Sequence, residues 1–387
     1  MSRLQFDILW HSPAIYASTG YGIQSANYVI RLIQKGYKIA VCMTNERYAS
    51  FSYHGIPHFA GGFADAPQDD YGVPGILNYS RVMDFRMVVT LFDLWPLHEV
   101  IGPTLKRLGV KWAPMAPIDS EPMTRATRDH LLHAEHPIAF SQHGMRMMDE
   151  EGISHATYIP HGVDTNLYKP MPRHKEMYKA RGKFLVGTVA TNTDPHDRKN
   201  WAGMMEAFGI FHKKHPDSVF FGHTCHDMSE GGFDLGSLSH RHNFNITVPT
   251  PWQYRIQATE LEMATMYSTF DVMLLPSKGE GFGVPIIEAQ ACGTPVIVTD
   301  WTAPRDLCGA GWKLPVVHKH WMKTEGYWGI PSVESIVEAL EEAYDLWKQK
   351  KLDDEMKDKA IEFTKQFDFD HIIEKHFVPF LEDALDG

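Results

Sequence analysis

Short apolar runs alternate with segments of helical periodicity along this chain of 387 residues. Between the first two runs, apolar residues recur at helical spacing, at Ile23, Ala26, Ile30 and Ile33, which predicts a βαβ opening. Strands that alternate with helices predict an α/β fold built on parallel sheets. The expected strands span residues 6–10, 38–43, 87–92, 111–117 and 138–141, and then 184–190, 218–222, 244–248, 271–275 and 294–299.

The two groups of predicted strands indicate two domains. A single hydrophobic core rarely serves more than about 250–300 residues, and this chain is longer. A polar, proline-bearing segment follows the first group, so we expect one domain over residues 1–170 and a second over 171–366. Two such halves facing each other would leave a cleft. Within the second domain, the helical spacing of Ile336, Leu340, Ala343 and Trp347 predicts a helix. We expect residues 367–387 to form a final helix.

The most informative stretch of the sequence is Gly279–Val298. A strand over residues 271–275 is broken by Pro276 and Gly279. Pro285 suits the first position of a helix and Gly293 suits the position just past its end, and a β-branched strand follows. The loop of this strand–loop–helix–strand unit lies at the carboxyl end of a parallel strand, where open α/β sheets bind ligands.

The chemistry of this loop favours an anionic ligand that also carries hydroxyls. Gly281 and Gly283 allow the backbone to approach a ligand, and free amides at the helix start favour a diphosphate. Glu280 on the turn and Glu288 in the first helical turn would repel phosphate, so we expect them to accept hydrogen bonds from sugar hydroxyls. Alternatively, Glu280 caps the loop and Glu288 stabilises the positive helix end.

Two adjacent cations, Arg198 and Lys199, follow the predicted strand over residues 184–190. A guanidinium fork and a point charge at a helix entrance suit a diphosphate leaving group. The alternative is a solvated helix start, although helix starts prefer acidic residues.

Composition and charge narrow the class of protein. Hydrophobic residues make up 43% and charged residues 22%, as in ordinary soluble domains. No apolar run reaches the roughly 18 residues of a membrane span, and Met1 leads directly into an apolar strand without a signal-peptide core, so we expect a cytoplasmic protein. The cysteines, Cys42, Cys225, Cys292 and Cys308, lack paired spacing, so we expect neither a disulfide framework nor a metal site.

The formal net charge of −11 disfavours a broad nucleic-acid surface, and it weakly disfavours DNA and anionic membranes as partners. One basic segment is an exception. We favour a solvated linker as its interpretation over a local phosphate-binding groove. Its basic residues are Lys169, Arg173, Lys175, Lys179, Arg181 and Lys183.

One segment contains Glu280, Gly281, Phe282, Gly283, Val284 and Pro285, followed by Glu288 and an Ala-x-Ala-x-Gly-x-Pro-Val run. This segment resembles the Glu-x7-Glu signature of the family 4 retaining glycosyltransferases, the group 1 glycosyl transferases of GT-B fold. The resemblance implies two Rossmann-like domains facing across a cleft, with the C-terminal helix crossing back to the N-terminal domain. It implies that Glu280 contacts the donor sugar, that Glu288 contacts the nucleotide ribose, and that Gly281–Val284 bind the donor. Family members also carry an Arg and a Lys at the place of Arg198 and Lys199, although commonly several residues apart.

In the first half the resemblance is looser. The loop with Gly20 and Gly22 corresponds to a glycine-rich loop that passes near the donor or acceptor, although a tight strand-to-helix turn explains it as well. Asp119 stands where many members have a histidine that contacts the sugar, and helix capping before residues 123–133 is its alternative role. Tyr21, His143 and His161 are acceptor-side candidates, with packing as the alternative for the histidines. The usual tryptophan of the last helix is replaced by Phe369.

The resemblance implies a retaining hexosyl- or pentosyltransferase that uses a nucleoside-diphosphate sugar as co-substrate and needs no metal cofactor. Its expected catalytic residues are Asp119, Arg198, Lys199 and Glu280. The acceptor stays open among a glycan, a lipid carrier, a small molecule, a protein and modified DNA. A non-catalytic sugar-nucleotide or glycan-binding protein is one alternative. A Rossmann enzyme that modifies nucleotide sugars is another, disfavoured because the segment after the first strand lacks the third glycine of Gly-x-Gly-x-x-Gly.

Overall fold

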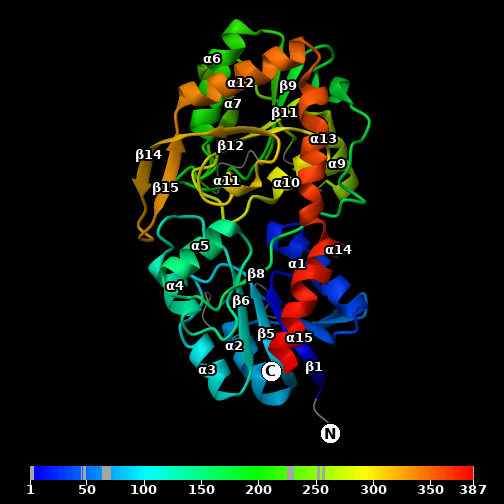
Figure 1. Ribbon diagram of the computed structural model, residues 1–387, viewed down its shortest axis with the longest axis vertical. Coiled ribbons are helices and arrows are strands. Elements are labelled where there is room, and N and C mark those ends of the chain that lie inside the picture. The colour runs from blue at the N-terminus through cyan, green and yellow to red at the C-terminus, as the bar shows by residue number, and fades with distance from the viewer. Residues whose placement is uncertain are drawn as a thin grey trace. The chain divides into compact units, whose positions relative to one another are not determined.

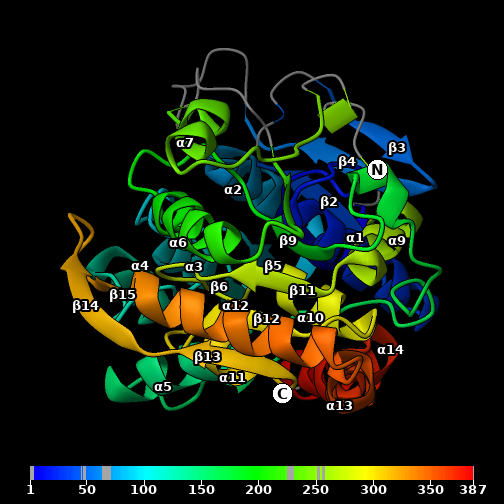
Figure 2. The same ribbon diagram turned by 90° about the horizontal axis from the view of Figure 1, so that it is seen from above.

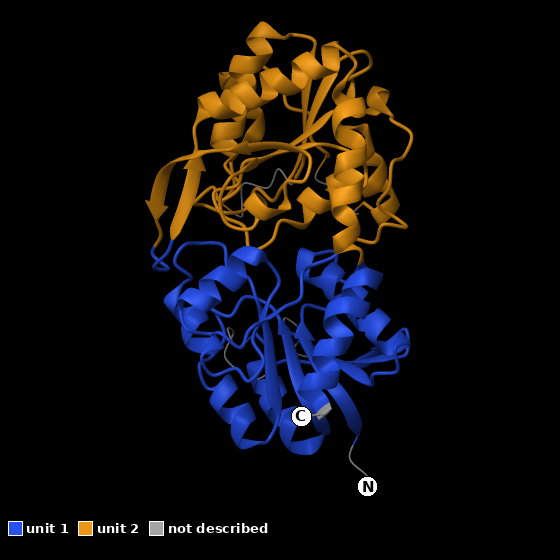
Figure 3. Cartoon of the chain, in the orientation of Figure 1, with its two compact units in different colours: residues 1–162, 323–326, 369–387 blue, residues 163–322, 327–368 orange. Residues whose placement is uncertain are grey.

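The structure is a computed structural model that describes residues 4–44, 46, 49–62, 71–224, 231–250, 253–254 and 258–386 (Figure 1). The chain divides into two compact units (Figure 3). Unit 1 comprises residues 1–162, 323–326 and 369–387, and unit 2 comprises residues 163–322 and 327–368. The chain thus passes from unit 1 to unit 2 after Gly162, whereas the sequence predicted this change near residue 170.

Unit 1 is built on an eight-stranded sheet of order β3-β4-β2-β1-β5-β6-β7-β8. Its strand pairs are parallel except for β3 with β4. The five strands predicted in this half are confirmed, whereas β3, β4 and β8 were not predicted. The strands are β1 (Gln5–Ser12), β2 (Ile39–Met43), β3 (Phe51–Tyr53), β4 (Ile56–Ala60), β5 (Asp84–Leu91), β6 (Lys111–Ala116), β7 (Ile138–Ala139) and β8 (Thr157–Tyr158).

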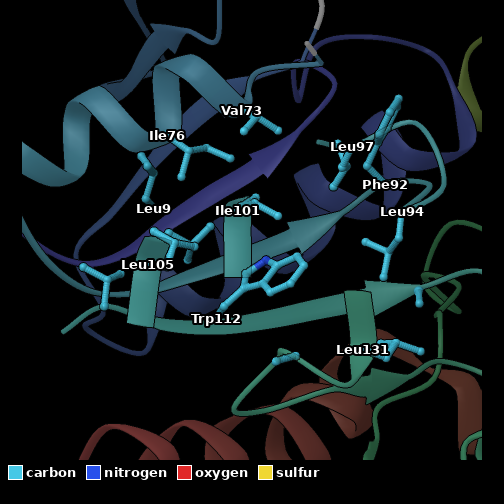
Figure 4. Close-up of a cluster of buried hydrophobic side chains, with 14 of the residues drawn as sticks. Leu9, Val73, Ile76, Phe92, Leu94, Leu97, Ile101, Leu105, Trp112 and Leu131 are labelled. Carbon is cyan, nitrogen blue, oxygen red and sulfur yellow. The ribbon is translucent and has the colours of Figure 1, made fainter. Parts of the chain in front are cut away.

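Helices cover this sheet and close its core. They are α1 (Gly20–Gln34), α2 (Val73–Val82), α3 (Ile101–Arg107), α4 (Arg125–Leu131), α5 (Gln142–Glu150), α14 (Phe369–Ile372), a π-helical turn (Ile373–Phe377) and α15 (Val378–Asp386). Figure 4 shows buried side chains of β1, α2, α3 and α4 gathered around the indole of Trp112 on β6. The Trp112 indole N–H donates to Thr90 Oγ1 at 3.0 Å, so its one polar atom is satisfied inside the core.

Helix α1 confirms the predicted βαβ opening, but its buried face is not the apolar stripe in the sequence. Ile30 is exposed, whereas the polar residues Gln24 and Ser25 are buried. Gln24 exchanges two hydrogen bonds with the backbone of Gly162, at 2.8 and 3.0 Å, and Ser25 Oγ accepts from the Trp10 indole at 3.0 Å. Tertiary hydrogen bonds therefore make this polar face suitable for burial.

The C-terminal segment belongs to unit 1, as the resemblance implied for the last helix. The Phe369 ring is buried and meets the Tyr28 ring edge to face, with centroids 5.5 Å apart. The Arg31 guanidinium lies 5.1 Å from the centre of the Phe369 ring, and its Nε donates to Asp370 Oδ1 at 2.8 Å. Phe369 is thus a packing residue that fixes the last helices against α1.

Unit 2 is built on a five-stranded parallel sheet of order β10-β9-β11-β12-β13. Four of its predicted strands are confirmed. The strand predicted over residues 244–248 is wrong, because only Thr247 pairs there, in an isolated bridge with Phe221. The strands are β9 (Phe184–Val189), β10 (Ser218–His223), β11 (Val272–Leu275), β12 (Val296–Thr299) and β13 (Gly311–Leu314), and β14 (Val316–Trp321) and β15 (Tyr327–Pro331) form a separate antiparallel ribbon.

The helices of unit 2 include the predicted helix with buried Ile336, Leu340 and Ala343, which is α12 and packs on α6 (Figure 2). They are α6 (Trp201–Lys214), α7 (Leu235–Arg241), α9 (Glu260–Thr269), α10 (Val284–Ala291), α11 (Pro304–Leu307), α12 (Val333–Lys348) and α13 (Leu352–Thr364), with 3-10 turns at Lys175–Tyr178 and Lys365–Phe367. Among the described residues, none of the helices combines the length and the apolar character that crossing a bilayer requires.

The basic segment over residues 169–183 is in part internally neutralised, contrary to its interpretation as a solvated linker. The carboxylate of Asp271 is fully buried, and Lys175 Nζ lies 2.8 and 2.6 Å from its two oxygens. Arg173 Nη1 lies 3.6 Å from the same group. These two cations therefore anchor the segment to the sheet, because a buried carboxylate requires a partner.

Candidate active site

The loop between β11 and α10 has the local structure that the sequence predicted. Gly283 is the N-cap of α10 and has φ +103°, a conformation that strongly favours glycine. A Cβ atom there would also lie 2.8 Å from Ile286 Cδ1. Pro285 occupies the second helical position rather than the predicted first, since α10 begins at Val284, and Gly293, with φ +82°, stands just past the helix end. The N-cap residue Gly283 has no side chain that could cap the α10 amides, which leaves this end suited to an anion.

Glu280 lies on this loop and holds both predicted cations. Its Oε2 accepts a hydrogen bond from Arg198 Nη1 at 2.7 Å, and its Oε1 accepts one from Lys199 Nζ at 2.5 Å. Arg198 Nη1 also donates to the carbonyl of Gly279 at 2.9 Å. The structure thus brings Arg198, Lys199 and Glu280 into one cluster at the carboxyl ends of β9 and β11.

The cluster keeps Glu280 ionised although its side chain is only 6% exposed. Burial by itself raises the pKa of Glu280, but the charges of Lys199 and Arg198 and the hydrogen bond from Lys199 outweigh burial and lower this pKa to about 2. Near neutral pH the cluster therefore contains one anion between two cations, with a net positive charge. Such a site attracts a further anion.

Asp197 and Lys278 fix the loop that carries Arg198 and Lys199, and the sequence did not predict either role. Asp197 accepts a hydrogen bond from the backbone N–H of Trp201 at 2.6 Å, at the start of α6, and lies 3.2 Å from Lys278 Nζ. The backbone N–H of Lys278 donates to the carbonyl of Arg198 at 2.8 Å. Lys278 directly precedes the Gly279–Glu280 turn, so its position in the motif was the available signal.

Glu288 lies in the second turn of α10, not the first, because the helix begins at Val284. Its Oε2 accepts a hydrogen bond from the Tyr267 hydroxyl at 2.7 Å, and the Tyr168 and Tyr267 ring centres are 6.3 Å apart. Burial raises the pKa of Glu288 to about 7, although hydrogen bonds from both tyrosines act in the opposite direction. Sequence reasoning missed both tyrosines, because nothing in the chain pairs them with Glu288.

The remaining donor-side residues differ in their exposure. Phe282 is buried, and its ring meets the Phe367 ring edge to face with centroids 5.9 Å apart. It therefore packs the loop against the 3-10 turn Lys365–Phe367. Gly281 and Val284 are half-buried on either side of Gly283. The backbone N–H of Glu280 donates to Thr302 Oγ1 at 3.1 Å, a further support that the sequence did not reveal.

Gly20, Tyr21 and Gly22 form the first turn of α1 in unit 1. Thr19 is the N-cap, and its hydroxyl accepts from the backbone N–H of Gly22 at 3.1 Å. A Cβ atom on Gly22 would lie 2.1 Å from the carbonyl oxygen of Ala17, so the close approach of this turn requires glycine there. Gly20 has open space around it, and the Tyr21 ring contacts the Phe92 ring with centroids 5.8 Å apart.

Asp119 is half-buried in the loop after β6. The alternative role of helix capping is wrong, because α4 begins at Arg125 and its N-cap is Thr124. His143, on α5, is fully buried, and its Nε2 lies 3.1 Å from the carbonyl oxygen of Ser120. The structure therefore brings His143 next to the loop that carries Asp119.

His161 is packed inside unit 1. Its ring stacks on Phe140 with centroids 4.1 Å apart, and its Nδ1 lies 3.4 Å from the Tyr28 hydroxyl. Burial lowers the pKa of His161 to about 3, so the imidazole is neutral at physiological pH. These contacts agree with the packing role that the sequence left open for this residue.

No group of three or more histidine, cysteine, aspartate or glutamate side chains suited to a metal ion occurs among the described residues. Cys42, Cys292 and Cys308 are free thiols, and Cys225 lies outside the described residues.

Comparison with known sequences places the Glu280 segment in a family. Residues 256–363 match the family model of "Glycosyl transferases group 1". The D-inositol 3-phosphate glycosyltransferase of Paenarthrobacter aurescens is 33% identical over 155 residues, which are 36% of this chain and 34% of that protein. The phosphatidyl-myo-inositol mannosyltransferase of Mycobacterium tuberculosis is 28% identical over 229 residues, 55% of this chain and 56% of that protein. The matches thus span about a third to a half of these relatives.

Solved structures match the whole chain. Sucrose-phosphate synthase from Thermosynechococcus elongatus has a TM-score of 0.76 and 15% identity, covering 100% of both chains. Anabaena Alr3699/HepE, solved in complex with UDP and glucose, has a TM-score of 0.71 and 13% identity, covering 98% of this chain and 100% of that one. At such identities the likeness concerns the fold, which consists of two Rossmann-like domains. The whole chain thus has the GT-B fold of these solved structures, and its residues 256–363 match the group 1 glycosyl transferases.

Proposed function

We propose that this protein transfers a sugar from a nucleoside-diphosphate sugar to an acceptor, with retention of configuration at the anomeric carbon. The observation that carries the proposal is the cluster of Arg198, Lys199 and Glu280 beside the uncapped start of α10. It combines two cations and free amides for a diphosphate with a carboxylate that can accept from sugar hydroxyls. A purely structural ion pair would not require the adjacent helix end.

In the proposed reaction, negative charge grows on the diphosphate as the bond to the anomeric carbon breaks. Arg198, Lys199 and the amides of Gly281–Gly283 stabilise that charge, and preorganised groups of this kind are worth about 3–4 kcal/mol per donor. We assign sugar hydroxyls to Glu280 and ribose hydroxyls to Glu288. Because two cations serve the leaving group, we propose that no metal ion is needed.

We assign acceptor recognition to unit 1. Asp119 is the proposed catalytic residue there, since an ionised carboxylate can stabilise positive charge on the anomeric carbon, and Tyr21, His143 and His161 are the acceptor-side candidates. Two similar proteins are named for glycosyl transfer to inositol 3-phosphate or mannosyl transfer to phosphatidyl-myo-inositol. Inositol phosphates therefore join glycans, lipid carriers, small molecules, proteins and modified DNA as acceptors to be tested.

A panel of UDP-, GDP- and ADP-sugars tests the proposed function. A ligand present at 100 times its dissociation constant stabilises the folded chain by about 2.7 kcal/mol, so one donor class should raise the melting temperature clearly. UDP-sugars come first, because a similar structure was solved with UDP and glucose. Free nucleoside diphosphate should then appear when an acceptor is added. Binding without release under any acceptor would instead indicate a sugar-nucleotide-binding protein.

Nucleotide binding should depend on pH through Glu288. Its pKa of about 7 means that the carboxylate is mostly ionised at pH 8 and mostly protonated at pH 6. If only the ionised form accepts both ribose hydroxyls, affinity for the nucleoside diphosphate should fall about tenfold as the pH is lowered from 8 to 6. The affinity follows the fraction of the protein in which Glu288 is ionised. Calorimetric titrations at both pH values check this.

The Glu288→Gln variant is the control for this pH dependence. Its amide does not titrate, so any pH dependence that it retains comes from the ligand or from other groups. An equally steep dependence in this variant would contradict the role of Glu288.

A further inference from the structure

The Glu280 carboxylate in unit 2 contacts the same two cations that the proposed function assigns to the donor diphosphate. One carboxylate oxygen lies 2.7 Å from Arg198 Nη1 and the other lies 2.5 Å from Lys199 Nζ. Each oxygen has its own cationic partner, so both are engaged. The carboxylate therefore already neutralises part of the positive charge that a phosphate group would bind.

These contacts are sheltered from water. The side chain of Glu280 is 6% exposed, that of Lys199 is 12% exposed and that of Arg198 is 27% exposed. Attraction between opposite charges strengthens as the surrounding dielectric falls, and charge-assisted hydrogen bonds are stronger than neutral ones. A diphosphate that draws the Arg198 Nη1 and Lys199 Nζ groups to itself therefore weakens contacts that already exist, and it frees the oxygens of Glu280 when it does so.

We propose, building on the proposed function, that Glu280 and the donor diphosphate compete for Arg198 and Lys199, so that Glu280 can accept from sugar hydroxyls only after a diphosphate has taken its cations. Sugar recognition is then conditional on the diphosphate. A free sugar meets a carboxylate that is already engaged. The same residue that contacts the sugar thus discriminates a nucleotide-linked sugar from a sugar without a diphosphate.

Inorganic pyrophosphate is a suitable probe, because it presents the diphosphate without base or sugar. In calorimetric titrations of the full chain, the Glu280→Gln variant should bind pyrophosphate about tenfold more tightly than the wild type, because the amide keeps the size of the side chain but removes the competing charge. Equal or weaker binding by a folded Glu280→Gln protein would overturn the competition.

Glu341→Gln is a matched control within the same unit. Glu341 also joins two basic groups, Lys214 Nζ at 2.9 Å and His215 Nε2 at 2.5 Å, but it lies on α12 and outside the cluster. Its replacement should leave pyrophosphate affinity unchanged, and a comparable gain would show that the effect is a general consequence of lost negative charge.

Should Glu280→Gln fail to fold, Glu280→Asp provides the second variant. It keeps the charge but withdraws it from both cations by one methylene, so pyrophosphate affinity should again increase, by a smaller factor. Thermal unfolding verifies that each variant is folded. An affinity at or below that of the wild type in Glu280→Asp would equally overturn the competition.

Parallel titrations with UDP, GDP and ADP separate this proposal from the proposed function. If the wild type binds a nucleoside diphosphate and Glu280→Gln binds it no more tightly, the competition is wrong and donor binding stands. If the wild type binds neither pyrophosphate nor any of the three nucleotides, the proposed function fails together with the competition.

Discussion

Replacing Lys199 by alanine is expected to lower the rate of sugar transfer about 10²–10³-fold, the usual consequence of removing one charge-stabilising donor from an active site. The ammonium group lies 2.5 Å from Glu280 and its side chain is only 12% exposed, so it acts where water screens charge poorly. Because negative charge on the leaving diphosphate is greatest in the transition state, kcat should fall more than KM rises. Release of nucleoside diphosphate at saturating donor measures the effect.

Lys214→Ala is the control for this experiment. Lys214 also pairs with a glutamate of unit 2, Glu341, at 2.9 Å, but its side chain is 58% exposed at the end of α6. Exposed ion pairs contribute little, so transfer should stay near the wild-type rate. Near-normal turnover in a folded Lys199→Ala protein would contradict the role assigned to Lys199.

Replacing Lys175 by methionine is expected to lower the free energy of unfolding by about 3 kcal/mol, the low end for breaking a buried ion pair from one side. The Asp271 carboxylate is fully buried, and Lys175 contacts both of its oxygens. Without Lys175 the carboxylate retains the backbone N–H of Leu185 at 2.7 Å and the more distant Arg173 at 3.6 Å, which moderates the loss. Urea unfolding followed by circular dichroism measures the change.

Two controls identify the buried charge as the cause. Adding Asp271→Asn to Lys175→Met removes the uncompensated carboxylate and should restore part of the stability.

Lowering the pH should also restore part of the stability of Lys175→Met, because it protonates the Asp271 carboxylate. Burial raises the pKa of Asp271 despite the charge of Lys175, so the folded state holds this proton more tightly than the unfolded chain does, and stability gained from protonation is lost as pH rises. The deficit of Lys175→Met should therefore be smaller at pH 5 than at pH 7, and an equal deficit would contradict the explanation.

The local structure around Glu280 was predictable because single residues impose it. Gly283 adopts a left-handed conformation at the start of α10, Pro285 tolerates the first helical turn, and Gly293 ends the helix with positive φ. Most strands were predictable for a similar reason, since a short apolar run between turn residues is usually buried as a strand of the sheet. The prediction of a strand over residues 244–248 was wrong because a strand also needs a neighbouring strand to pair with, and only Thr247 pairs there.

Burial of polar residues was not predictable from periodicity. Gln24 and Ser25 enter the core of unit 1 because Gly162 and Trp10 satisfy their hydrogen bonds, while the apolar Ile30 stays at the surface. The Asp271 carboxylate is likewise buried because Lys175, far away in the sequence, neutralises its charge. In each case the partner decides whether a polar side chain is buried, and periodicity in one segment contains no information about a partner in another.

The sequence by itself determined the α/β fold, the loop before α10 and the residue types of the candidate site, because glycine, proline and apolar runs act through short-range sterics and burial. Only the tertiary structure decided how those residues are paired. It placed Glu280 between Arg198 and Lys199 and buried Glu288 beside Tyr267. The physical reason is that charge state and hydrogen bonding depend on distances of a few ångströms between residues that folding brings together from separate segments.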